Sequence, residues 1–258
     1  MITACLQGGL GNQMFQIAAA HDLAVRNDDI SLFNLDKCHT PMQGNKSITY
    51  HENIYHKLKH SKNLTIEKEF TETSSHYKPI PYFPNLRING YFQSEKYFDR
   101  NRILNLFEID NNSFTYLNKN YLELFNESCI SLQVRRGDYL KLKNKFYVQD
   151  LSYFESALSL FDKSDLIIVV SDDIEWCKLN LSKLNRKIKY IDTEPDHICL
   201  NIMRFCKNNI ISNSTFGWWG AWLNTYKNKK VVSPKKWYGV LKTNLISEDL
   251  LPKEWIRI

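Results

Sequence analysis

The stretch ISLQVRRGDYL, Ile130 to Leu140, places two adjacent arginines directly after a short apolar run. The run predicts a strand over residues 130–134 that ends in a loop. Arginines keep their charge in proteins and grip phosphate oxygens bidentately, so the pair indicates an anion site. The alternative is an arginine that pairs with Asp138 and braces the loop. Because neighbouring residues of an extended segment face opposite ways, we expect one arginine of the pair to face a ligand and the other the scaffold.

Strands and helices alternate on both sides of this stretch. The downstream pattern predicts helix 151–161, strands 166–170 and 188–191, helix 196–206, strand 209–212 and helix 215–226. The upstream pattern predicts strand 2–7, a glycine turn at 8–11, helix 12–26, strand 30–35, and a strand ending near Gln93 with Ser94 as a helix cap. Such alternation predicts parallel sheets and an α/β fold.

A polar segment, residues 107–127, separates the two series of elements. We therefore predict two α/β domains, residues 1–125 and 126–258, with a cleft between them. Ligands of such sheets gather at the carboxyl ends of the strands. The segments that follow predicted strands are polar or rich in glycine: residues 7–13, 135–138, 171–173 and 212–215.

The segment at 212–215, Ser-Asn-Ser-Thr, leads into the predicted helix that begins FGWWGAWL. Small polar side chains beside the free N–H groups of a helix N-terminus form an anion site without a metal. The alternative, ordinary capping by Ser212 or Ser214, is the commoner role of such residues. The tryptophans Trp218, Trp219 and Trp222 are predicted to pack in the core.

Two carboxylates, Asp172 and Asp173, follow the apolar run LIIVV. They can bind a divalent metal, hydrogen-bond a guanine edge, or cap the next helix. Metal binding needs several converging oxygen ligands, and no further carboxylate cluster lies nearby in sequence, so capping with base recognition is favoured. A histidine pair at helical spacing, His56 and His60, with His51 nearby, is predicted to be exposed surface rather than a metal site.

Composition describes an ordinary folded protein of 258 residues, 43% hydrophobic and 24% charged, with net charge +6. That charge fits an anionic ligand, an acidic membrane surface or nucleic acid without choosing among them, and a solvated lysine-rich surface is the commoner explanation for the lysines. The sequence shows neither a signal peptide nor an apolar run that could span a bilayer, so we expect a cytoplasmic protein. Six scattered cysteines predict reduced thiols, without disulfides or zinc sites.

Four motifs resemble the bacterial α-1,2-fucosyltransferases of glycosyltransferase family 11: GGLGNQMFQIA, GYFQSEKYF, VRRGDY and IISNSTFGWWGAWL. They occur in that family's order and extend from Gly8 to Leu223. The resemblance implies a GT-B type fold of two Rossmann-like domains facing a cleft. It also implies an inverting, metal-independent transfer of L-fucose from GDP-β-L-fucose to the 2-hydroxyl of a terminal galactose. The C-terminal half would hold GDP, and the N-terminal half would shape the acceptor side.

The resemblance also assigns residues. It places Arg135 on the donor β-phosphate, with Arg136 supporting it. The remaining donor contacts that it implies are Asn12 and Gln13 near the sugar and phosphates, Ser212, Asn213, Ser214 and Thr215 on the phosphate side, and Asp172 on the guanosine side. Gln133 stands where the family usually has histidine; it can hydrogen-bond the donor but cannot carry a proton. Gly217 stands where serine is common, a departure that we take as minor.

The implied mechanism neutralises charge on the departing GDP with Arg135 and the helix N-terminus near Ser214. Asp138 is the candidate general base; its simpler role is a salt bridge that fixes Arg136. We expect no cofactor and no metal. The expected acceptor is a galactose-terminated oligosaccharide in a glycan such as O-antigen, lipid-linked, at the cytoplasmic face of the membrane, where the enzyme is soluble or loosely associated.

Two rival functions stay open at this point. One is a metal-dependent glycosyltransferase that uses Asp172 and Asp173 with another nucleotide sugar. The other is a non-catalytic binder of nucleic acid or polysaccharide. No RNA-binding signature is present, and the basic residues are not interleaved with aromatic residues in a repeating way, so we expect no nucleic-acid partner.

Overall fold

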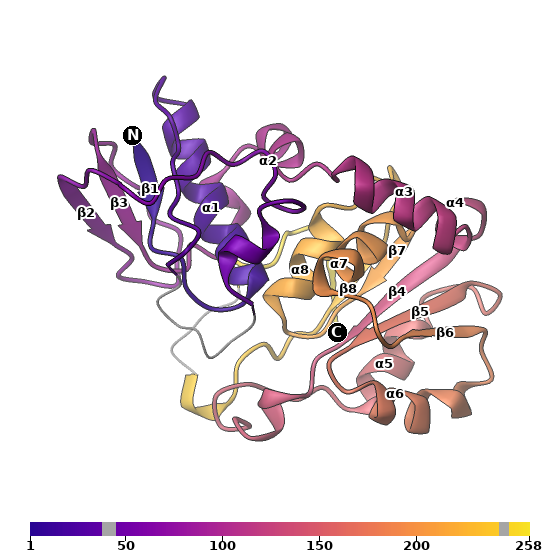
Figure 1. The fold of residues 1–258 in the computed structure, drawn as a ribbon. Coiled ribbons are helices and arrows are strands. Elements are labelled where there is room, and N and C mark those ends of the chain that lie inside the picture. Colours follow the sequence, from indigo (N-terminus) through magenta and orange to yellow (C-terminus); the bar gives the residue numbers. More distant parts are fainter. Residues whose placement is uncertain (38–44, 243–247) are drawn as a thin grey trace. The chain divides into compact units, whose positions relative to one another are not determined.

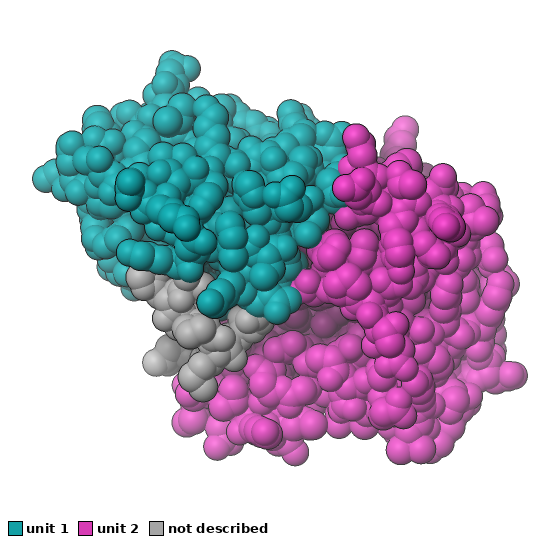
Figure 2. Space-filling model, viewed as in Figure 1, with its two compact units in different colours: residues 1–110, 246–252 teal, residues 111–245, 253–258 magenta. Residues whose placement is uncertain are grey.

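The computed structural model of the chain describes residues 1–37, 45–242 and 248–258. The chain forms two compact units (Figure 2). Unit 1 comprises Met1–Asp110 with Ile246–Pro252, and unit 2 comprises Asn111–Leu245 with Lys253–Ile258. The boundary at residue 125 and the separate role of each domain stay predictions.

The sheet described in unit 1 has three parallel strands in the order β1-β3-β2. They are β1 (Ile2–Ala4), β2 (Lys68–Thr71) and the central β3 (Leu86–Asn89). Helix α1 (Leu10–Val25) is almost entirely buried against this sheet (Figure 1). The strand expected at 30–35 is reduced to single bridges, one from Ser31 to Ile2 and one from Phe33 to His60.

Shorter elements complete unit 1: η1 (Ser47–Tyr50), η2 (Glu95–Tyr97) and α2 (Arg100–Leu106). The expected cap at Ser94 is confirmed, because its side chain accepts a hydrogen bond from the Lys96 N–H, although the element that follows is one 3-10 turn. The strand expected to end near Gln93 ends at Asn89.

Unit 2 contains a parallel sheet of the described strands in the order β6-β5-β4-β7-β8-β9. The strands are β4 (Cys129–Val134), β5 (Leu166–Ser171), β6 (Ile188–Ile191), β7 (Asn208–Ile210), β8 (Val231–Ser233) and β9 (Ile256–Arg257). Numbered along the chain, this is the 3-2-1-4-5-6 order of a doubly wound, dinucleotide-binding sheet. The first four strands were predicted to within two residues; β8 and β9 are too short for a periodic signal.

Helices cover the sheet of unit 2 (Figure 1). Helices α5 (Leu151–Leu158) and α6 (Ile174–Leu181) share one core with β4, β5, β7 and β8. Helices α7 (Asp196–Phe205) and α8 (Thr215–Trp222) pack against each other, and α3 (Asn111–Asn120) and α4 (Glu123–Asn126) pack on α7. The short helices of this unit are η3 (Asp138–Leu140), η4 (Ser182–Leu184) and η5 (Val240–Lys242).

The three tryptophans of α8 are core residues, as predicted. Trp218, Trp219 and Trp222 are at most 1% exposed, and the rings of Trp218 and Trp222 stack at 5.7 Å between centroids. The helix that carries them ends at Trp222, earlier than the expected residue 226.

Neither unit contains, in its described residues, a helix long and apolar enough to traverse a membrane. None of the five described cysteines forms a disulfide, and four of them are buried: Cys129, Cys177, Cys199 and Cys206. Cys38 lies outside the described residues.

Candidate functional site

The strand order of unit 2 brings three loops to one edge of its sheet. Strand β4 pairs in parallel with β5 on one side and with β7 on the other. Crossovers leave in opposite directions from these two neighbours, and at such a switch point the connecting helices diverge and open a crevice at the carboxyl ends. The loops that begin at Arg135, Asp172 and Ile211 meet there.

Arg135 is held at the first position after β4. Its guanidinium pairs with Asp138 Oδ1 at 2.6 Å and with Asp172 Oδ2 at 3.0 Å, and its backbone N–H donates to Ser212 Oγ at 3.1 Å. The guanidinium carbon lies 5.3 Å from the ring centre of Tyr139. Because one third of the side chain stays exposed, this cation is accessible to a ligand.

Arg136 is the scaffold member of the pair. Its guanidinium lies 4.0 Å from the ring centre of Trp176, and its Nε donates to Asp173 Oδ2 at 3.1 Å. Only 15% of the side chain is exposed, less than half the exposure of Arg135. The structure therefore divides the two arginines as alternation along an extended segment predicts, and it identifies which faces outward.

Three aspartates surround these two arginines. Asp138 pairs with Arg135, so the expected salt bridge from Asp138 to Arg136 is wrong. Asp172 accepts the Arg136 N–H at 2.9 Å, and Asp173 caps α6 by accepting the Trp176 N–H at 3.3 Å. Capping was expected of this carboxylate pair and is confirmed for Asp173; the guanosine contact of Asp172 stays a prediction.

Gly137 allows the arginine loop to approach Asp172. A Cβ at Gly137 would lie 2.4 Å from Asp172 Oδ2, inside contact distance. Only a residue without a side chain lets the backbone pass so close to a carboxylate that is also bonded to both neighbouring arginines.

Ser212 fastens the end of β7 to the end of β4. It is fully buried; its hydroxyl donates to the Gln133 carbonyl at 3.0 Å, and its N–H lies 3.1 Å from both that carbonyl and Gln133 Oε1. Gln133 is itself 4% exposed. These two residues set the spacing of the switch point, and their expected donor contacts stay predictions.

Asn213 is the polar centre of the neighbouring loops, a role that no sequence signal indicated. Its Nδ2 donates to the carbonyls of Tyr147 (2.9 Å) and Trp237 (2.6 Å), and its Oδ1 accepts from Gln149 Nε2 at 3.3 Å. The Tyr139 hydroxyl donates to the Asn213 carbonyl at 3.0 Å, and burial raises the pKa of Tyr139, which keeps that proton in place.

The N-terminus of α8 follows directly. Ser214 is its N-cap residue, but its side chain makes no capping bond, so the expected serine cap is wrong. The hydrogen bonds within α8 begin with the Trp218 N–H, which donates to the Ser214 carbonyl. The N–H groups of the first turn, beginning with Thr215, therefore have no acceptor within the helix. A helix start with this geometry favours an anion.

The glycine turn of unit 1 has its own polar cluster. Gly8 has φ +78°, and a Cβ there would lie 2.4 Å from Asn12 Nδ2. Asn12 Oδ1 accepts from Gln93 Nε2 at 2.9 Å. Gln13 is fully buried, and its Nε2 donates to the Gly8 carbonyl at 2.9 Å, so it braces the turn. The donor contacts of Asn12 and Gln13 stay predictions.

Glu72, at the turn of residues 90–92, is a polar residue of unit 1 that the sequence did not indicate. Its carboxylate accepts the N–H groups of Tyr91 (2.7 Å) and Phe92 (3.1 Å), which hold the turn that leads to Gln93. Burial raises the pKa of Glu72, against the lowering effect of those two hydrogen bonds.

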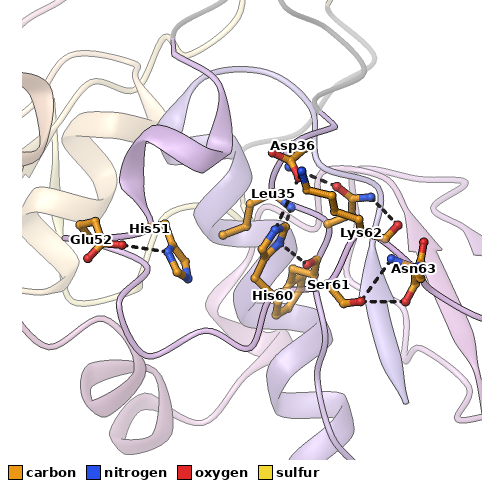
Figure 3. Close-up of polar contacts among 10 residues, drawn as sticks. Leu35, Asp36, His51, Glu52, His60, Ser61, Lys62 and Asn63 are labelled. Atoms are coloured by element: carbon orange, nitrogen blue, oxygen red, sulfur yellow. Dashed lines mark hydrogen bonds and ion pairs between the residues drawn. The ribbon is translucent and has the colours of Figure 1, made fainter.

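The histidines are engaged in local contacts (Figure 3). His60 Nδ1 lies 3.0 Å from the Phe33 carbonyl oxygen, and Nε2 lies 3.5 Å from Asp36 Oδ2; His51 Nδ1 lies 3.2 Å from Glu52 Oε1. All three histidines of this segment are half-buried and lie outside any α-helix, so the prediction of exposed histidines is wrong. Within the described ranges no three histidine, cysteine or acidic side chains come together as a metal-binding group.

The model of the family described as Glycosyl transferase family 11 matches residues 1–258. The chain belongs to glycosyl transferase family 11. It is 31% identical to the O-antigen biosynthesis glycosyltransferase WbnK of Escherichia coli, over 99% of each chain. It is also 28% identical to an alpha-1,2-colitosyltransferase of Escherichia coli, over 100% of this chain and 99% of the relative.

A solved structure with a similar fold is the NodZ alpha-1,6-fucosyltransferase from Bradyrhizobium, soaked with GDP-fucose. The TM-score is 0.53 at 11% identity, and the match covers 86% of this chain and 92% of NodZ. Membership of family 11 makes the chain a glycosyltransferase, and this likeness shows that its mixed α/β fold with parallel sheets is shared with a fucosyltransferase.

In this family 11 chain, the residues at 133 and 217 depend on each other. A Cβ at Gly217 would lie 2.6 Å from Gln133 Oε1 and 3.2 Å from the Ile211 Cβ. The Gln133 carboxamide therefore fills the space that a larger residue at 217 would need. Glutamine at position 133 therefore requires glycine at position 217. Gly217 is not the minor departure that the sequence suggested.

We expect Gly217→Ala to lower the free energy of unfolding by about 1–3 kcal/mol, because the new methyl group overpacks the site. Gln133→Ala removes the carboxamide that a methyl group at position 217 would meet. The backbone carbonyl at position 133 still accepts the Ser212 N–H. The double variant should therefore be more stable than the sum of the single effects predicts, by roughly 0.5–3 kcal/mol. Urea unfolding of the four proteins measures this coupling, and strictly additive effects would contradict it.

Proposed function

We propose that the chain is an inverting α-1,2-fucosyltransferase that moves L-fucose from GDP-β-L-fucose to the 2-hydroxyl of a terminal galactose in a glycan such as O-antigen. The observation that carries this proposal is the accessible Arg135 guanidinium at the switch point of a 3-2-1-4-5-6 sheet, beside the start of α8. Membership of family 11 supports the reaction class, and the GT-B arrangement of two facing domains belongs to the same proposal.

The proposed chemistry depends on charge at the leaving group. As the bond between fucose C1 and the β-phosphate oxygen stretches, negative charge grows on GDP. Arg135 and the N–H groups at the start of α8 would stabilise that charge, while Arg136, fixed on Trp176 and Asp173, holds the loop in place. The acceptor hydroxyl attacks the opposite face of C1, which inverts the anomeric centre.

In this proposal Asp138 holds Arg135 before the donor arrives. Its Oδ1 lies 2.6 Å from the guanidinium, so the carboxylate orients the arginine toward the ligand position. A diphosphate oxygen would compete with Asp138 and Asp172 for the same N–H groups. Release of Asp138 on donor binding would free it to accept the proton of the acceptor hydroxyl, the role proposed for it as general base.

The carboxylates at the switch point are already used by protein donors. Asp172 accepts from the Arg136 N–H and pairs with Arg135, and Asp173 accepts from Arg136 and from the Trp176 N–H. Carboxylates neutralised by arginines are poor ligands for a divalent cation. This argument favours transfer without a metal over the metal-dependent alternative.

Arg135→Ala should lower kcat by about a hundredfold or more, because the variant loses a charged donor to the developing diphosphate. The ion pairs that it removes are one-third exposed and contribute little to stability, so the fold should persist. Initial rates of fucose transfer, combined with thermal unfolding, measure both effects.

The matched control is Arg26→Ala, which removes an exposed arginine of unit 1 that follows α1. It should leave kcat unchanged. Near-normal turnover of folded Arg135→Ala would remove the central role of this arginine.

Transfer should proceed at its full rate in excess EDTA, because fixed cations and N–H groups take the place of a metal. Rates measured with EDTA, and again after adding Mg²⁺ or Mn²⁺, check this. Loss of activity in EDTA that either ion restores would establish the metal-dependent alternative.

The proposed substrates are tested by a donor and acceptor screen. GDP-fucose is assayed against a panel of galactose-terminated oligosaccharides, and the linkage of the product is read by NMR. A product with fucose α-1,2-linked to galactose is expected. The corresponding colitosyl donor is assayed in parallel, since one relative is named an alpha-1,2-colitosyltransferase. Preference for that donor would replace fucose in the proposal and keep the linkage.

A further inference from the structure

Two lysine-rich segments of unit 2 lie side by side. One is residues 140–147, which begins at the last residue of η3, and the other is residues 235–241, which includes the first two residues of η5. Phe146 and Tyr238 form an antiparallel bridge. The Gly239 N–H donates to the Lys145 carbonyl at 3.0 Å, and the Leu241 N–H donates to the Asn144 carbonyl at 2.8 Å. We call their joint surface the lysine patch.

Glycine is required at the centre of the lysine patch. A Cβ at Gly239 would lie 2.7 Å from the carbonyl oxygens of both Lys143 and Asn144. The two backbones are therefore in direct contact, and the patch is one surface rather than two separate loops.

The lysine patch carries a high and uncompensated positive charge. Its five exposed lysines are Lys141, Lys143, Lys145, Lys235 and Lys236. The two segments contain no acidic residue, and none of the five lysines forms an ion pair with any described residue. The patch is distinguished by five lysines on two segments that are hydrogen-bonded to each other and contain no carboxylate.

The same two segments also carry exposed aliphatic side chains. Val240 is 73% exposed and Leu241 is 68% exposed, and Leu140 at the other segment is 38% exposed. Water solvates such side chains poorly, and two consecutive aliphatic residues on a one-turn helix are a small wedge among cations. Cations around exposed aliphatic groups are the combination that inserts at an anionic lipid interface.

The lysine patch is connected to the candidate site through buried amides. Asn213 donates to the carbonyl of Tyr147 in one segment, and Gln149 Nε2 donates to the Lys236 carbonyl at 2.9 Å in the other. Gln149 also donates to Asn213 Oδ1. The segments therefore have a fixed position relative to the residue that precedes Ser214 and the start of α8.

We propose that the lysine patch docks the protein on a bilayer that contains anionic phospholipid, with Val240 and Leu241 inserted below the headgroups. The five lysines neutralise lipid phosphates, and the aliphatic pair adds apolar burial that a nucleic acid could not provide. Docking is independent of the donor and of fucosyl transfer. The docking proposal therefore stands if the proposed transferase activity fails its test, and the proposed activity stands if docking fails.

The test is co-sedimentation of the full-length protein with vesicles of phosphatidylglycerol and phosphatidylcholine, and with vesicles of phosphatidylcholine alone. Binding is expected only to the anionic vesicles and should weaken at high salt. Lys143→Glu/Lys145→Glu should lower the partition coefficient by about 30-fold or more. Val240→Ser/Leu241→Ser should lower it on the order of tenfold, because apolar burial is lost.

Matched controls use exposed residues of unit 2 outside the patch. Lys163→Glu/Lys183→Glu and Leu179→Ser should bind as the unchanged protein does, since all three positions are exposed. Thermal unfolding of each variant verifies folding. The proposal is overturned if the unchanged protein ignores anionic vesicles, or if patch and control variants lose equal affinity. The proposal is also overturned if Lys143→Glu/Lys145→Glu abolishes vesicle binding while Val240→Ser/Leu241→Ser binds normally. In that case, binding of the unchanged protein to a single-stranded oligonucleotide would identify the patch as a general polyanion site.

Discussion

The parallel pairing of β4 with β7 is the constraint on which the candidate site depends. It places the carboxyl end of β4 directly beside the carboxyl end of β7, and the helices that follow these two strands leave the sheet in opposite directions. Ser212 makes the pairing specific at the last position, because its hydroxyl and its N–H both bond to Gln133. A shift of one residue would turn Arg135 to the opposite face and bury the positive charge, so register and function are fixed together.

Around that pairing, two arginines and three aspartates form a network that is nearly balanced in charge. Arg136 and Asp173 are committed to Trp176 and to the start of α6, whereas Arg135 is shared between Asp138 and Asp172 at one-third exposure. An arginine shared by two carboxylates is oriented before a ligand arrives, and its partners can be exchanged for phosphate oxygens of the same geometry. The same loop continues into the segment 140–147, so the surroundings of Arg135 and the lysine patch are parts of one connected structure.

Much of this arrangement follows from local sequence. The apolar runs before Arg135 and Asp172 predicted β4 and β5, because buried parallel strands read as continuous hydrophobic segments. The two strands of unit 2 that were missed, β8 and β9, have three and two residues, and so carry no periodicity. The role of Asn213 was also missed, because its partners are backbone carbonyls at Tyr147 and Trp237, which leave no trace in residue type.

The sequence by itself determined the alternation of strands and helices, the polar strand ends and the two fixed charges, since each depends on residues close together in the chain. Only the tertiary structure decided that Arg135 faces outward while Arg136 stacks on Trp176, that Asp138 pairs with Arg135, and that Gly217 makes room for Gln133. The first and the last of these outcomes bring together residues that are 40 and 84 positions apart in the chain, Arg136 with Trp176 and Gln133 with Gly217. Their partners are chosen by the order of the strands and the angle of the helices, which no local pattern specifies.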